Sequence, residues 1–221
     1  MSQFRIGEIL KTAWGIFKEK MLFVWLVFAI IWGVSLFFGL LQKRVGEESI
    51  FGLLVALVSL VASIILQLGL IRIYLDLIDK KDTKVETLFS EYQHFFRYIV
   101  ASILYGLVVI IGLIFFIVPG IYLALRYSFY SYFIIDKNVG ILESLQKSSE
   151  LTRGNKWKIL LFLLVICGIN ILGLLFFVVG LLFTIPITSI AFSVLYRTLL
   201  NPPKTEPIAP ILPEPHITPL Q

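Results

Sequence analysis

Long apolar stretches alternate with short polar connections along most of the chain. A helix that crosses the roughly 30 Å hydrocarbon core of a bilayer needs about 20 mainly apolar residues, because no water is present there to satisfy its backbone amides. Six stretches meet or approach this length, at 21–42, 50–78, 95–118, 119–136, 157–179 and 182–200. The pattern therefore predicts an all-α, polytopic membrane bundle with six transmembrane helices in residues 1–200.

Two of these apolar stretches are long enough to be divided. The one from Phe95 to Tyr132 breaks most naturally at Pro119-Gly120, because proline lacks an amide donor and glycine permits a turn. Residues 159–196 carry no charge, and we expect a tight turn within them near residues 179–184. A re-entrant or broken helix at Pro119-Gly120 or at Pro186 would instead leave four or five full crossings.

Lysine and arginine are concentrated in alternate connections. The predicted cytoplasmic set is Arg5, Lys11, Lys18, Lys20, Lys80, Lys81, Lys84, Lys137, Lys147, Arg153, Lys156 and Lys158. The opposite connections hold only Lys43 and Arg44, beside Glu47 and Glu48. Because short basic loops stay in the cytoplasm, both termini are predicted to be cytoplasmic.

Three segments that precede the first, third and fifth spans share a second pattern. Apolar residues recur at helical spacing in 6–17, 85–96 and 141–151, and charged residues occupy the other faces. Each segment has a glutamate near its start, namely Glu8, Glu86 and Glu143. The pattern predicts three interfacial amphipathic helices. Each would open a unit completed by two spans, which favours three tandem repeats; the alternative is that short loops between spans tend to be amphipathic in any case.

The composition changes after Leu200, where prolines recur through residues 201–221. Such a segment builds neither helix nor core, so we predict a Pro-rich disordered tail.

Composition and charge exclude several classes of protein. With 58% hydrophobic residues and a mean hydropathy of +0.94, the chain is not an ordinary soluble domain. Its net charge of +5 is explained by membrane orientation, so no nucleic-acid partner is expected. The single cysteine, Cys167, forms no disulfide within the chain, and two histidines, His94 and His216, build no metal site or catalytic triad. We therefore expect no enzyme activity, no cofactor and no metal.

Polar side chains within the predicted spans are the candidate functional groups. Arg126 lies about 9 Å along the helix beyond Gly120, where a charged group costs about 2.5 to 3.5 kcal/mol on insertion scales. It forms either an anion or lipid-headgroup site, or a guanidinium satisfied by helix-end carbonyls and tyrosine hydroxyls. Asn170 and Gln67 are the other intramembrane candidates, and Asn170 is expected to form an interhelical hydrogen bond.

The residues around the fourth predicted span also carry a family resemblance. They comprise Pro119-Gly120-Ile121-Tyr122, Arg126, Asp136 and the stretch 143–157, which contains Glu143, Ser144, Lys147, Ser148, Gly154 and Trp157. This region resembles the membrane domain attached to some bacterial glycerophosphodiester phosphodiesterases and its stand-alone six-span relatives. The resemblance implies a bacterial inner-membrane protein without the hydrolytic activity, because the soluble catalytic barrel is missing. From the residues themselves, 143–154 reads as an interfacial helix ended by glycine, after which Trp157 anchors the next span at the headgroups.

These observations lead to one principal hypothesis and two alternatives. The principal hypothesis is a non-enzymatic membrane protein whose partners are membrane lipids with anionic headgroups, and which organises or assists the membrane. The first alternative is a small transporter or efflux component with a site near Arg126, which requires a polar cavity. The second is an accessory subunit of a membrane complex, and a protein partner or a homo-oligomer is left open.

Overall fold

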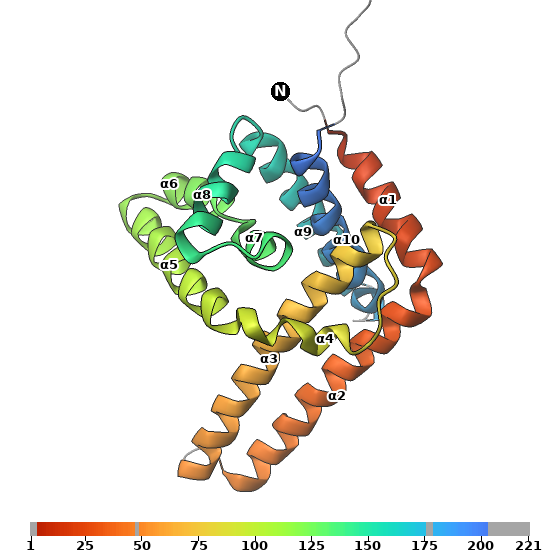
Figure 1. The fold of residues 1–221 in the computed structure, drawn as a ribbon, viewed down its shortest axis with the longest axis vertical. Coiled ribbons are helices and arrows are strands. Elements are labelled where there is room, and N and C mark those ends of the chain that lie inside the picture. Colours follow the sequence, from red (N-terminus) through yellow and green to blue (C-terminus); the bar gives the residue numbers. More distant parts are fainter. Residues whose placement is uncertain (1–3, 47–48, 176–178, 203–221) are drawn as a thin grey trace, which may run out of the picture.

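Residues 4–46, 49–175 and 179–202 are described by the computed structural model, and every regular element in that part of the chain is a helix (Figure 1). The predicted all-α class is confirmed. The predicted tail lies outside the described residues, apart from residues 201 and 202. The elements are α1 Ile6–Glu19, α2 Met21–Val45, α3 Ile50–Ile78, α4 Thr87–Ser90, η1 Glu91–His94, α5 Phe95–Phe115, α6 Ile117–Arg126, α7 Tyr130–Lys137, α8 Ile141–Leu151, α9 Lys156–Leu175 and α10 Val179–Leu200.

Five helical segments within the described residues are long and apolar enough to cross a membrane. They are Met21–Val45, Ile50–Ile78, Thr87–Phe115, Lys156–Leu175 and Gly180–Leu200. Runs of 18 or more mainly apolar residues are typical of transmembrane helices, and this chain of 221 residues contains five of them within the described residues. The chain is an integral membrane protein.

The fourth predicted span, 119–136, is not a continuous helix. It is divided into α6 and α7, which are separated at Tyr127–Phe129 and are each too short to cross a bilayer. The boundary at its start also differs from the prediction, because α5 ends at Phe115 and the extended residue Phe116 makes the turn. Pro119 then lies in the first turn of α6, where an amide donor is not needed.

The turn predicted near residues 179–184 is also wrong. Those residues are helical, because α9 ends at Leu175 and α10 already begins at Val179. The helix α10 then continues through Pro186 rather than breaking there.

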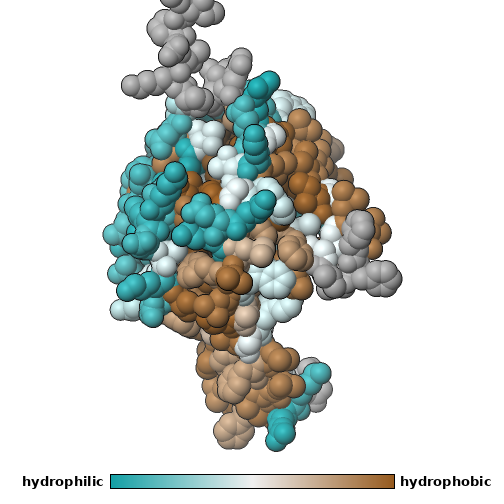
Figure 2. All heavy atoms as spheres, turned by 90° about the vertical axis from the view of Figure 1, so that its right-hand side faces the viewer, coloured by the Kyte–Doolittle hydropathy of each residue, from teal (hydrophilic) through white to brown (hydrophobic). Residues whose placement is uncertain are grey.

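Three helical hairpins, α2–α3, α5–α6 and α9–α10, make up most of the molecule. The α2–α3 hairpin projects from the rest, while α10 packs against α1, α3 and α9 (Figure 1). Figure 2 shows hydrophobic side chains over this projection and hydrophilic ones gathered on one side of the body. The buried centre contains rings from α7, α9 and α10, including Tyr132, Phe162 and Tyr196.

Glycines allow close approach of the paired helices near two of the hairpin turns. A Cβ atom on Gly112 would lie 3.0 Å from Gly120 Cα, across the α5–α6 turn. A Cβ atom on Gly180 would lie 2.8 Å from Gly173 Cα, across the α9–α10 turn. Small residues at helix contacts let backbones approach closely where lipid gives no hydrophobic driving force.

The three predicted amphipathic segments differ from one another in the structure. In α1 the apolar residues Ile9, Ala13 and Phe17 are buried, and the helix packs on α10. The second segment forms only the short α4 and η1, which lead directly into α5. It buries Leu88 but exposes Tyr92, so its predicted apolar stripe is not one face.

In the third segment, α8, the buried face differs from the predicted one. Leu142 of the predicted stripe is exposed, whereas Ser144 and Ser148 are fully buried. The reason is that α8 packs against α5 and α7, and the hydroxyls of its inner face meet backbone groups there.

Substitution of Gly69 tests the packing of α3. A Cβ atom there would overlap the backbone carbonyl of Leu88, whereas the space around Gly106 on α5 is open. Gly69→Val is therefore expected to lower the free energy of unfolding by about 1–3 kcal/mol or more, and Gly106→Val to change it by under about 0.5 kcal/mol. Thermal unfolding in detergent measures both, and equal effects of the two substitutions would contradict this packing.

Candidate functional site

The break between α6 and α7 leaves backbone groups without their usual helical partners. In a continuous helix the Arg126 carbonyl would accept a hydrogen bond from the amide of Tyr130. That amide instead donates to Tyr127 O, at 3.2 Å. The amide of Phe129, whose acceptor in a continuous helix would be the Leu125 carbonyl, also bonds elsewhere, while that carbonyl accepts from the Ser128 hydroxyl at 3.0 Å.

Two hydroxyls of the α8 region satisfy these groups. The Phe129 amide donates to Ser148 Oγ at 3.0 Å, and Ser148 Oγ donates to Arg126 O at 3.2 Å. Thr152 Oγ1, just after α8, donates to the same carbonyl at 3.1 Å. Both side chains are fully buried. We call Ser148 and Thr152 the hydroxyl cap, because they form hydrogen bonds with the Arg126 carbonyl at the end of α6 and with the Phe129 amide just before α7.

The Arg126 side chain lies beside this cap. Its Nε donates to Ser149 Oγ at 2.6 Å, and its guanidinium carbon lies 5.4 Å from the centre of the Tyr127 ring. It lines a hollow of about 410 Å³ together with Tyr105 and Gln146. No acidic residue pairs with Arg126 in the part of the chain that the structure describes. The guanidinium is thus partly satisfied by a hydroxyl and keeps further donors for an anion.

The other predicted residues of this region have separate roles. Glu143 pairs with Lys147 across one helical turn at 2.8 Å, and the pKa of Glu143 is lowered, first by the hydrogen bond from Lys147. Ser144 Oγ donates to Ile141 O at 2.6 Å. Gly154 adopts φ of +81°, a conformation that favours glycine, in the turn before α9.

Trp157, in the first turn of α9, is 83% exposed. A ring in this position fits the predicted contact with the headgroup region.

Asn170 and Gln67 lie apart from Arg126. Asn170 Nδ2 donates to Thr188 Oγ1 at 3.3 Å, which joins α9 to α10 as expected for an intramembrane asparagine. Gln67 lines a different hollow of about 380 Å³, which Thr188 and Tyr74 also line. Thr188 therefore connects Asn170 with the hollow that Gln67 lines, and Arg126 lines a separate hollow.

An ion cluster that the sequence did not reveal joins three helices. Arg197 of α10 bonds both carboxylate oxygens of Asp136 at 2.8 Å, and Asp79 Oδ2 at 2.7 Å. Tyr196 Oη also donates to Asp136, at 3.0 Å. The Arg197 guanidinium and the Tyr196 hydroxyl thus provide hydrogen bonds to both carboxylate oxygens of Asp136.

A second polar cluster surrounds the buried pair Glu91 and His94. His94 Nδ1 lies 2.9 Å from Glu91 Oε2, and His94 Nε2 lies 3.1 Å from Asn138 Oδ1. Arg97 donates to the same Asn138 oxygen at 2.6 Å, and Arg72 lies 3.9 Å from Glu91. The cluster holds the start of α5 to α3 and to the α7–α8 connection.

The chemistry available here is electrostatic. Within residues 4–46, 49–175 and 179–202 no group of three or more histidine, cysteine or acidic side chains could hold a metal ion. The acidic side chains of both clusters are engaged with cations or histidine, whereas several cations of the α8–α9 region have no acidic partner among the described residues.

The fold and these sites define an all-helical integral membrane protein. Residues 105–202 match the model of a family described as a protein of unknown function, DUF975. The matched segment runs from within α5 to just beyond α10 and includes the hydroxyl cap. The match covers less than half of the chain, so the similarity to the family concerns this segment alone. No curated protein and no solved structure matches the chain. None of these findings bears on the resemblance to the phosphodiesterase membrane domain, which stays a prediction.

Removal of the hydroxyl cap tests its role. The double substitution Ser148→Ala with Thr152→Val leaves the Phe129 amide and the Arg126 carbonyl buried and unpaired, so we expect the free energy of unfolding to fall by about 2–6 kcal/mol, at about 1–3 kcal/mol for each unsatisfied group. Ser35→Ala, which removes only an exposed hydrogen bond of α2 to its own backbone, is the matched control. Thermal unfolding in detergent compares them. An unfolding temperature of the double variant equal to that of the control would show that the cap is not needed.

Proposed function

We propose that this chain is a non-enzymatic integral membrane protein that binds anionic lipid headgroups along one side of its bundle and so organises or assists the membrane around it. One observation carries the proposal. Four exposed cations have no acidic partner among the residues that the structure describes: Lys80 and Lys84 between α3 and α4, Arg153 between α8 and α9, and Lys158 in the first turn of α9.

The topology that goes with this proposal has six crossings. In it α6 and α7 together form a broken fourth crossing, and both termini are cytoplasmic in a bacterial inner membrane. The charge distribution supports this arrangement, because the α5–α6 and α9–α10 turns carry no lysine or arginine and the α2–α3 turn carries only Lys43 and Arg44. The accessory-subunit and homo-oligomer alternatives stay predictions.

Electrostatics favours lipid as the partner of these cations. Each basic side chain near an anionic leaflet contributes about 1 kcal/mol, and the effect decays within a Debye length of about 8 Å at physiological salt. The exposed ring of Trp157, between Lys156 and Lys158, is of the kind that lies at headgroup level. Cations next to an exposed aromatic residue are therefore suited to a membrane surface rather than to bulk water.

The test measures how lipid charge affects thermal unfolding of the purified protein in detergent. Added anionic phosphatidylglycerol is expected to raise the unfolding temperature more than zwitterionic phosphatidylcholine does. Replacing Lys80, Lys84, Arg153 and Lys158 by glutamine is expected to remove roughly half or more of that difference, because it removes four contributions of about 1 kcal/mol each.

The control for this test is Lys43→Gln with Arg44→Gln at the α2–α3 turn, which is expected to leave the difference unchanged. Equal stabilisation of the wild-type protein by both lipids would refute the proposal. So would a quadruple variant that responds to phosphatidylglycerol as the wild-type protein does.

Passage of a small solute is a second candidate function, favoured by the hollow of about 380 Å³ between α3, α7, α9 and α10. Hydroxyl groups of Ser131, Thr188 and Ser189 line it. The hydroxyl-bearing ring of Tyr74, which is only 3% exposed, also lines it. A space lined by several hydroxyl groups and an amide suits water or an uncharged polar solute.

Cysteine accessibility tests this second candidate in a Cys167→Ser background. If the hollow opens to water, Ser131→Cys reacts with a water-soluble methanethiosulfonate reagent in intact membranes. Ser63→Cys, on an exposed part of α3 within a candidate span, serves as the unreactive control. An unreactive Ser131→Cys would eliminate the solute pathway.

A further inference from the structure

A large hollow lies between α6 and the start of α9. Its volume is about 600 Å³, within the range of ligand sites in proteins. Its apolar wall is formed from both helices, by Val118, Ile121 and Leu125 of α6 and by Leu160 of α9. Lys156, Tyr122 and Trp157 complete the lining, and we call this hollow the α6–α9 groove.

Positive charge is gathered beside this apolar wall. Lys156 Nζ lies 3.6 Å from the centre of the Tyr122 ring, where the π face holds it in the absence of an acidic side chain. Arg126 lies one helical turn after Tyr122 on α6, and Arg153 directly precedes Gly154 of the groove lining. None of these three cations forms an ion pair with a residue inside the described ranges.

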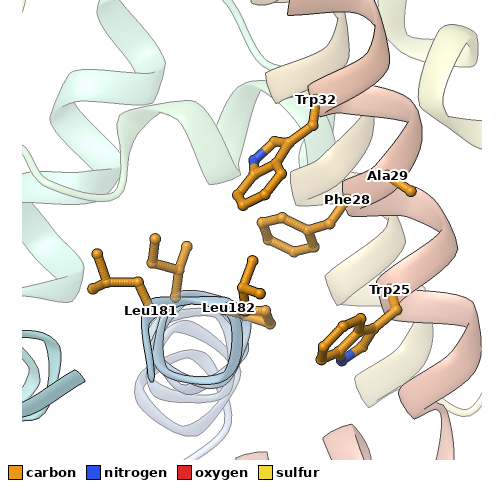
Figure 3. Close-up of a pocket in the computed structure, with 8 residues that line it drawn as sticks. Trp25, Phe28, Ala29, Trp32, Leu181 and Leu182 are labelled. Atoms are coloured by element: carbon orange, nitrogen blue, oxygen red, sulfur yellow. The ribbon is translucent and has the colours of Figure 1, made fainter. Parts of the chain in front are cut away.

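A second groove, between α2 and α10, is apolar and uncharged and provides a comparison with the α6–α9 groove. Figure 3 shows Trp25, Phe28 and Trp32 of α2 facing Leu181 and Leu182 of α10. Its volume is about 210 Å³, and its lining contains no charged residue. It has nothing to select one occupant over another, so it serves as a control rather than as a site.

The combination in the α6–α9 groove fits one class of ligand. A small soluble anion would contact the cations but leave the apolar wall uncovered, and a neutral apolar molecule would leave the cations without a counter-charge. An amphiphile with a phosphate group and an acyl chain meets both requirements, because lysine and arginine bind phosphate oxygens and the wall accepts the chain. In an integral membrane protein the available amphiphile of this kind is a phospholipid of the surrounding bilayer.

We propose that the α6–α9 groove binds one anionic phospholipid, with its phosphate at Lys156 and an acyl chain along Ile121, Leu125 and Leu160. This inference rests on the proposed function and names one particular site within it. The hydroxyl cap contributes indirectly, because Thr152 bonds to Arg126 O and thereby fixes the chain just before Arg153 and Lys156 against the end of α6.

The experiment counts lipids that stay bound to the full-length protein. Protein purified in detergent with equal amounts of phosphatidylglycerol and phosphatidylcholine is examined by native mass spectrometry under increasing collisional activation. The wild-type protein is expected to retain one phosphatidylglycerol under conditions that remove all other lipid.

Two kinds of variant locate that lipid. Leu160→Trp fills the groove and is expected to reduce retention at least tenfold, and Ile121→Trp, on the facing helix, does the same if Leu160→Trp fails to fold. Lys156→Gln is expected to keep a retained lipid but to lose the preference for phosphatidylglycerol. Ala29→Leu, which reduces the α2–α10 groove by a comparable change, is expected to retain the lipid as the wild-type protein does.

The outcomes separate this inference from the proposed function. If no lipid is retained one to one, or if both tryptophan variants retain it, the site is refuted. In that case a persisting effect of phosphatidylglycerol on the unfolding temperature would leave the proposed function standing. Loss of both the retained lipid and the thermal effect would refute the two together.

Discussion

A helix interrupted in apolar surroundings exposes backbone groups that lipid cannot satisfy, and the structure depends on how this is solved at Tyr127–Phe129. Ser148 and Thr152 provide the missing donor and acceptor from outside the broken segment. This contact joins α8 to the junction of α6 and α7, and it brings the connection that follows α8 against α6. The cations of the α6–α9 groove are placed by the same contact, so the backbone requirement and the proposed lipid site share one physical origin.

The ion cluster around Arg197 holds the other side of the bundle together. Asp79, Asp136 and Arg197 lie at or just beyond the ends of α3, α7 and α10, which are the last helices of the three predicted units. Next to this cluster, the rings of Tyr132 and Tyr196 pack against each other in the core, with their centres 5.0 Å apart. The ends of α3, α7 and α10 therefore meet at one polar centre, and the tandem arrangement of three units stays a prediction.

The sequence predicts the long helices well because a run of about 20 apolar residues leaves few other structures available. It also identifies Arg126 as a charged residue within a predicted span and Trp157 as an anchor at the headgroups, whereas Ser148 is noted only within the stretch that carries the family resemblance. It does not predict the break at Tyr127–Phe129, because no proline or glycine marks that position and the hydroxyls that permit the break come from α8. A break is predicted at Pro119-Gly120, but the structure has it at Phe116, because proline is compatible with the first turn of a helix.

The Arg197 cluster escaped the sequence for a different reason. Its members lie 57 to 118 positions apart, and each reads alone as an ordinary charge at the end of an apolar run. Only the packing of α3, α7 and α10 brings them together. The charges at the ends of α3 and α7 include aspartates and the charge near the end of α10 is an arginine, so attraction is possible. One sequence does not show, however, that those ends converge.

Hydrogen–deuterium exchange of the Phe129 amide, in the protein embedded in lipid nanodiscs, tests the account most directly. Because this amide is buried and bonded to Ser148 Oγ, it is expected to exchange as slowly as the amides within α7. Exchange at the rate of the solvent-exposed turn at Gly154 would contradict the account, because the break would then lack the internal partners on which the arrangement of α6, α8 and α9 depends.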